Sequence, residues 1–110
     1  MQSEIENITQ HLVAALHPVR IYLFGSRARG DNRSDSDYDI YIVMPDDTAK
    51  INPLYCIAYT ATQDVKTLPV DFAINTVSTF ERRKTGPTLE KVVAREGVVL
   101  YEHSVGFAKP

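Results

Sequence analysis

The sequence lacks several features that define whole classes of protein. Its 110 residues include a single cysteine, Cys56, so an internal disulfide is excluded and a reducing compartment is expected. No apolar run reaches the roughly 18 residues that a membrane span needs. The first residues are acidic and polar, unlike a secretory signal peptide. Together these absences predict a cytoplasmic protein.

A strong charge of one sign is also missing. The net charge is −2, so no overall basic field attracts nucleic acid, and no direct nucleic-acid partner is indicated. The three histidines share no metal-ligand spacing. The length suits one domain and leaves no room for a second substrate-binding lobe. We expect a domain over residues 1–102, followed by a flexible tail over residues 103–110.

Hydrophobic periodicity and turn residues predict the order of the elements. A first helix is expected from Ser3 to Leu16, with Ser3 and Glu6 forming a capping box. The other expected helices cover residues 27–30 and 53–64, then run from Ser78 to about residue 86 and from Pro87 to about residue 97. The expected strands are Arg20–Phe24, Asp37–Met44, Thr67–Ile74 and Val98–Tyr101. Strands mixed with helices in this order predict an α/β (α+β) fold, a mixed β-sheet flanked by helices.

Two aspartates begin the second expected strand. Asp37 and Asp39 are two residues apart, and alternate side chains of a strand share a face. Two carboxylates that close repel each other, and a divalent cation removes the repulsion. Hard oxygen ligands suit Mg²⁺. Asp71, within an otherwise apolar strand, is a further carboxylate whose burial would be costly without a partner or a metal.

A glycine–serine pair ends the first expected strand. Gly25 permits positive φ and close approach of a ligand, and Ser26 adds a hydroxyl beside backbone N–H groups. Arg27 and Arg29 follow with charge-assisted donors. The segment is typical of a phosphate-binding loop next to a metal site, as a nucleoside triphosphate requires.

Gly25-Ser26, a ten-residue spacer, Asp37-Tyr38-Asp39 and the downstream Asp71 together resemble the signature of the DNA polymerase beta-like nucleotidyltransferase superfamily. The length resembles its smallest branch, the minimal nucleotidyltransferases found beside HEPN-domain proteins. The resemblance implies the palm-like nucleotidyltransferase fold, two Mg²⁺ ions and ATP as substrate. It also implies site residues: Asp37, Asp39 and Asp71 as catalytic and metal-binding, and Gly25, Ser26, Arg27 and Arg29 as nucleotide-binding.

The activity that the resemblance implies is transfer of AMP from ATP to an acceptor hydroxyl. In the minimal branch the partner is typically a HEPN-domain toxin and the transferase is the antitoxin, which in some pairs transfers AMP to a tyrosine of the toxin. The resemblance thus implies such a tyrosine as the acceptor here. Two alternatives remain open: a non-catalytic module that neutralises a HEPN partner by occlusion, and an adenylyltransferase of small molecules. The residues also allow structural interpretations, with Asp71 paired to an arginine, and Arg27 and Arg29 as ordinary surface charge.

Overall fold

The computed structural model describes residues 3–103 and contains five helices and four strands in the predicted order. The helices are α1 (Glu4–Leu16), α2 (Ser26–Arg29), α3 (Asn52–Thr62), α4 (Val77–Arg83) and α5 (Leu89–Glu96). The strands are β1 (Arg20–Phe24), β2 (Tyr38–Met44), β3 (Val70–Thr76) and β4 (Val98–Glu102). The predicted tail over residues 103–110 lies, beyond His103, outside the described residues.

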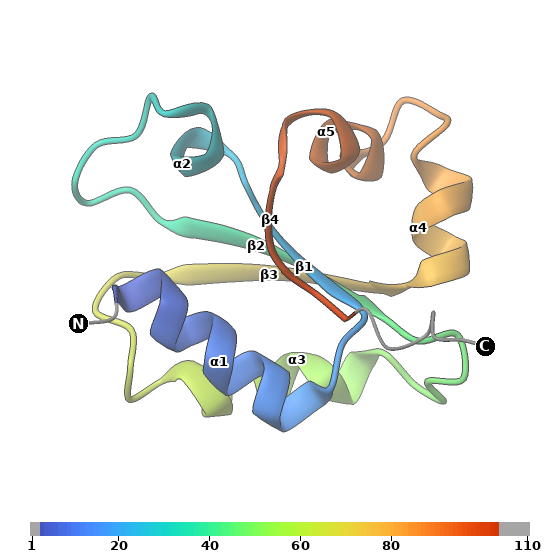
Figure 1. Cartoon of the computed structure of the whole chain (residues 1–110), viewed down its shortest axis with the longest axis horizontal. Coiled ribbons are helices and arrows are strands. Elements are labelled where there is room, and N and C mark those ends of the chain that lie inside the picture. Colours follow the sequence, from blue (N-terminus) through green and yellow to red (C-terminus); the bar gives the residue numbers. More distant parts are fainter. Residues whose placement is uncertain (1–2, 104–110) are drawn as a thin grey trace.

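The four strands form one mixed sheet in the order β3-β2-β1-β4. β1 pairs antiparallel with β2 and β4, while β2 pairs parallel with β3. Helices α1 and α3 cover one face of this sheet, and α2, α4 and α5 lie on the other (Figure 1). The predicted mixed sheet flanked by helices is therefore confirmed.

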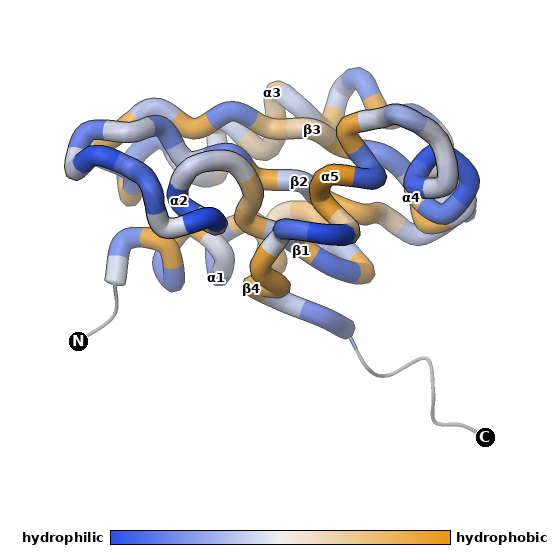
Figure 2. Tube along the Cα trace, turned by 90° about the horizontal axis from the view of Figure 1, so that it is seen from above, coloured by the Kyte–Doolittle hydropathy of each residue, from blue (hydrophilic) through white to orange (hydrophobic). Residues whose placement is uncertain are grey.

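Alternation along β2 divides the core into two clusters. Ile40 and Ile42 pack with α1 and α3 residues on one face. Tyr41 and Val43 pack on the other face with Phe80 of α4 and Val93 of α5. Figure 2 shows the hydrophobic residues concentrated along the inner strands β1 and β2. Because both faces of β2 are covered, the register of β2 is fixed by packing.

The start of α1 is as predicted. Ser3 caps the helix by accepting a hydrogen bond from the Glu6 N–H, and the Glu6 carboxylate accepts one from the Ser3 N–H, at 3.2 and 2.8 Å. None of the helices over residues 3–103 is long and apolar enough to cross a membrane.

Two helix starts differ from prediction. Thr76 caps α4 by accepting from the Thr79 N–H, whereas Ser78, where the helix is predicted to begin, lies inside it. Thr88 caps α5 by accepting from the Lys91 N–H, and Pro87 precedes that cap. In both places the hydroxyl of the threonine just before the helix accepts from one N–H of the first turn that has no intrahelical acceptor.

Strand β3 begins three residues later than predicted. Pro69 has no N–H to donate to a strand ladder, and Thr67 donates its N–H and hydroxyl to the Glu4 carboxylate instead. The strand continues past Ile74 to Thr76 because it follows β2 in register to the end.

Candidate functional site

The turn after β1 requires glycine for two reasons. Gly25 has φ 76° and ψ −156°, a conformation that residues with a side chain rarely adopt. A Cβ at this position would also collide with the Asp39 carboxylate. The first intrahelical bonds of α2 come from the N–H groups of Ala28 and Arg29 to the Gly25 carbonyl, both at 3.1 Å. The N–H groups of Ser26 and Arg27 come earlier in the helix and have no intrahelical acceptor, as in any first helical turn.

The sheet register brings two of the predicted carboxylates together. Asp39 of β2 and Asp71 of β3 are direct partners in the parallel pair, and Asp39 is also the partner of Phe24 of β1. Asp37 lies one residue before β2, exposed at the end of the loop. The three aspartates thus converge on one end of the sheet, beside the Gly25 turn.

Asp39 lies in an unfavourable environment for a negative charge. Burial raises the pKa of this half-buried carboxyl, the carboxylates of Asp71 and Asp37 raise it further, and Arg29 opposes them. No ion pair between groups in residues 3–103 includes any of the three aspartates. Such unbalanced charge is typical of a site that binds a cation or works as an acid or base.

Asp71 differs from prediction in its burial. The sequence predicts an aspartate inside an apolar strand, but β3 is an edge strand and the Asp71 side chain is exposed. The edge position leaves Asp71 accessible to a molecule approaching from solvent.

We tested whether these residues suit Mg²⁺. Across residues 3–103, no group of three His, Cys, Asp or Glu side chains is gathered closely enough to hold a metal by itself. Mg²⁺ is commonly held by one or two carboxylates completed by substrate phosphates and water. Asp39 and Asp71 are paired across the two strands, and no basic side chain in residues 3–103 forms an ion pair with either. They therefore fit a site in which substrate phosphates and water complete the coordination of Mg²⁺.

The two arginines of α2 have different surroundings. Arg29 is exposed, pairs with Asp31 at 3.2 Å and Glu96 at 3.9 Å, and is close enough to Asp39 to oppose the rise in its pKa. The Arg27 guanidinium instead donates to the carbonyls of Ser34 and Ser36, at 3.1 and 2.9 Å. Arg27 therefore contacts the loop that leads to Asp37.

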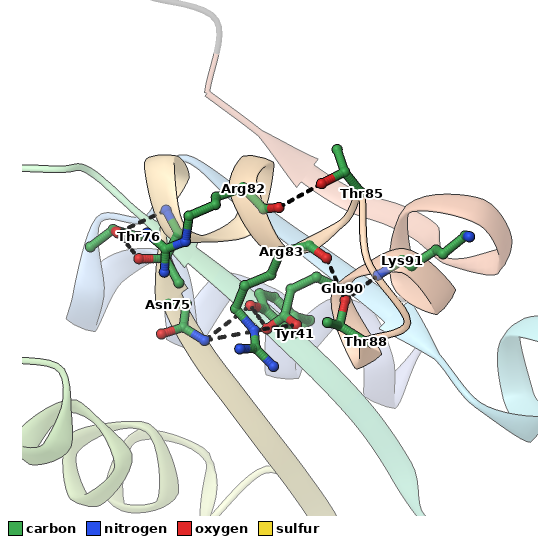
Figure 3. Close-up of polar contacts among 10 residues, drawn as sticks. Tyr41, Asn75, Thr76, Arg82, Arg83, Thr85, Thr88, Glu90 and Lys91 are labelled. Carbon is green, nitrogen blue, oxygen red and sulfur yellow. Dashed lines mark hydrogen bonds and ion pairs between the residues drawn. The ribbon is translucent and has the colours of Figure 1, made fainter.

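A buried polar cluster on the same sheet face was not predicted. The Tyr41 hydroxyl donates to Glu90 at 2.6 Å, Arg83 Nε donates to Glu90 at 2.9 Å, and Asn75 Nδ2 donates to Tyr41 at 3.2 Å (Figure 3). Only 3% of Glu90 is exposed. Its place on an otherwise polar helix face gave no signal in the sequence, because the partners come from β2, β3 and α4.

The Arg82-Arg83-Lys84 cluster is mostly engaged with this network and its neighbours. Arg83 binds Glu90 as described, and Lys84 pairs with Glu81 at 2.6 Å. These contacts account for two of the three cations as structural residues.

Residues 3–100 match the nucleotidyltransferase domain family. No curated protein matches the chain. Among solved structures, a candidate nucleotidyltransferase from Sulfolobus solfataricus is 20% identical, with a TM-score of 0.60, covering 92% of this chain and 79% of that one. A toxin–antitoxin structure with AMP-PNP is 23% identical, with a TM-score of 0.61, covering 92% of this chain and 76% of that one. At these identities the two structures support the fold.

Proposed function

The chain belongs to the nucleotidyltransferase domain family, and from this premise we propose that it transfers AMP from ATP to a hydroxyl group of a partner protein. The observation that carries the proposal is the in-register pairing of Asp39 with Asp71 beside the Gly25 turn. These carboxylates form no ion pair with a basic side chain of residues 3–103, and they lie next to a turn that only glycine can form. Such an arrangement has no evident structural purpose.

The residues divide the work as follows. Ser26 and the backbone of the Gly25 turn hold the β- and γ-phosphates, and exposed Arg29 adds a nearby positive charge. Asp39 and Asp71, together with the phosphates, would hold Mg²⁺, and Asp37 would add a third carboxylate from the end of the loop. The bound ion would neutralise charge on the attacking and leaving oxygens. Asp71 accepts the proton of the acceptor hydroxyl. At the same time the hydroxyl oxygen forms a bond to the α-phosphorus, and pyrophosphate leaves. The exposed edge position of Asp71 suits an acceptor supplied from outside the chain.

We propose a tyrosine of a HEPN-domain toxin as the acceptor, with this chain as the antitoxin of the minimal nucleotidyltransferase type. A separate protein is favoured because residues 3–103 form one sheet with its helices and no second lobe to shape an acceptor site. The toxin–antitoxin neighbour, solved with an ATP analogue, supports a partner protein together with a nucleotide. ATP is proposed as the substrate on the same grounds.

The test combines the purified chain, a purified HEPN-domain protein as the candidate acceptor, Mg²⁺ and ATP labelled at the α-phosphate. We expect label on the partner, and mass spectrometry should place AMP on a tyrosine. Asp39→Asn and Asp71→Asn should each lower the rate by about 10²–10⁴-fold. Asp35→Asn is the matched control, since Asp35 is an exposed aspartate of the loop outside the proposed site.

A second candidate function is neutralisation of the partner by occlusion alone. It is favoured by the lack of a ready-made three-carboxylate metal site in residues 3–103. Full neutralisation by an Asp39→Asn, Asp71→Asn double variant, with partner binding intact, would support occlusion and exclude the catalytic proposal. Binding without neutralisation would support catalysis.

A further inference from the structure

Arg27 makes an unusual set of contacts for a residue next to a candidate phosphate-binding turn. Its Nε donates to the Ser36 carbonyl at 2.9 Å, and its Nη2 donates to the Ser34 carbonyl at 3.1 Å. Its Cζ lies 4.4 Å from the centre of the Tyr38 ring, in a cation–π contact. Two edges and one face of the guanidinium are therefore used within the protein.

Two of these contacts are made to the residues that flank Asp37 in the chain. Ser36 precedes Asp37 and Tyr38 follows it, so Arg27 contacts the chain on both sides of this carboxylate. Asp37 itself is exposed and belongs to no ion pair among the described residues. Its backbone position therefore depends on Arg27 and on a few loop bonds, such as Ser36 N–H to the Arg33 carbonyl at 3.1 Å.

We propose that Arg27 is a positioning residue that fixes Asp37 relative to the Gly25-Ser26 turn. Arg27 directly follows Ser26, so one side chain connects the phosphate-binding turn to the loop that carries the carboxylate. This inference rests on the proposed function, and it replaces direct phosphate binding as the role of Arg27. A guanidinium is suited to this role because its planar fork serves two carbonyls while its face stacks on an aromatic ring. A lysine ammonium offers the charge without that geometry.

The experiment compares Arg27→Lys with Arg33→Lys, a matched change at an exposed arginine of the same loop. Hydrogen exchange is measured at the Arg33 and Ser36 amides, which are hydrogen-bonded within the loop. Amides of β1 and β2 report whether the variant remains folded. Mg²⁺ titrations are followed in two ways: by the melting-temperature shift that ATP produces, and by the rate of labelled transfer.

With Arg27→Lys, we expect exchange of the two loop amides to accelerate by at least about tenfold, while the inner strands stay protected. The Mg²⁺ concentration for half of the ATP-induced shift should rise by about 10–100-fold, as when a group that orients a metal ligand is lost. The KM for ATP at saturating Mg²⁺ should stay within about twofold, because the phosphate contacts remain. Arg33→Lys should change none of these values.

Unchanged loop exchange, or faster exchange with an unchanged Mg²⁺ requirement, would overturn the positioning role. An increase in the KM for ATP alone would instead indicate that Arg27 binds the phosphates. If the wild-type chain transfers no nucleotide, the proposed function fails, while the exchange and Mg²⁺-binding measurements still decide the role of Arg27.

Discussion

Two acidic regions lie on the same face of the sheet and differ in how their charge is balanced. At one end, Asp39 faces Asp71 across the strand pair, and the effects of burial and neighbouring carboxylates raise its pKa. Two residues along β2, Tyr41 contacts Glu90. Burial alone would raise the pKa of Glu90, but hydrogen bonds from Tyr41 and Arg83 outweigh it and hold that pKa below its usual range.

The comparison separates two uses of a carboxylate. Glu90 is almost fully buried and receives donors from three elements, so its charge helps to hold α4 and α5 to the sheet. Asp39 is half-buried, with two like charges near it, so its charge is a cost to the fold. A cost of this kind persists where the group is needed for binding or catalysis. The predictions below remove one carboxylate region or the other.

The largest expected effect is on stability, from Glu90→Ala. It leaves the buried Tyr41 hydroxyl without its acceptor and opens a small cavity, which together cost about 3 kcal/mol. The melting temperature should fall by roughly 10–20 °C in thermal unfolding followed by circular dichroism. Glu81→Ala is the control, because Glu81 is an exposed residue of α4 and should change stability by less than about 0.5 kcal/mol. Equal losses from both variants would show that the buried network contributes no special stability.

A smaller loss is expected from Tyr41→Phe. The ring and its packing against Phe80, 5.3 Å between centroids, are retained, while the bond to Glu90 is lost. A hydrogen bond to a charged group is worth about 1.5–3 kcal/mol, and the lower value applies because Arg83 and Asn75 still contact Glu90. Chemical denaturation should show this loss with an unchanged m-value. Nucleotide transfer measured at a temperature where the variant is folded should be unaffected, since Tyr41 belongs to the stabilising region.

The same comparison explains which features could be predicted from the sequence. Asp37, Asp39 and Gly25 lie within one short segment, so local spacing predicts that they lie near one another. The predicted strand begins at Asp37, whereas β2 begins at Tyr38, so Asp37 belongs to the loop and only Asp39 lies on the strand. The exposure of Asp71 and the Glu90 network depend on strand order and on contacts between distant segments. The contacts of Arg27 are a further example: its neighbours in sequence predict phosphate binding, and the structure adds contacts to Ser34, Ser36 and Tyr38 that no local pattern indicates.

Helix faces show a related limit. Ile57 is a large apolar residue of α3, yet it is 42% exposed, and the buried residues of this helix are Ala58 and Thr62. Leu89 and Val92 of α5 are also exposed, whereas the neighbouring Val93 is part of the core. In α3 the small residue Ala58 faces the sheet, and in α5 Val93 does. Periodicity identifies a helix more reliably than it chooses among neighbouring apolar positions.

Asp39→Asn should stabilise the protein in metal-free buffer, opposite in sign to the two changes above. Removing the charge relieves its repulsion with Asp71 and Asp37 and the cost of its partial burial. A gain of about 0.5–1 kcal/mol is expected, the usual size for improving an unfavourable charge. Calorimetry in EDTA should show a higher melting temperature for the variant, with Asp35→Asn as an unchanged control. A lower melting temperature would mean that Asp39 has a stabilising partner, and the contrast with Glu90 would fail.

The smallest expected effect is the pH dependence of that gain. The pKa of Asp39 is raised in the folded state, so above its ordinary value of 3.8 the folded protein binds this proton more tightly than the unfolded chain does. Stability from this group is therefore greatest at low pH and is lost as pH rises through the raised pKa. Asp39→Asn cannot titrate at this position, so its advantage over the wild type should be small near pH 4 and complete by pH 7. Glu90 has the opposite sign: its stabilisation is present above its ordinary pKa and is lost as pH falls through the lowered one. The contribution of Asp39 is obtained by subtracting the wild-type melting temperature from that of Asp39→Asn at each pH, because the Glu90 contribution is common to both proteins. A difference that stays constant from pH 4 to pH 7 would show that Asp39 titrates as an ordinary surface aspartate.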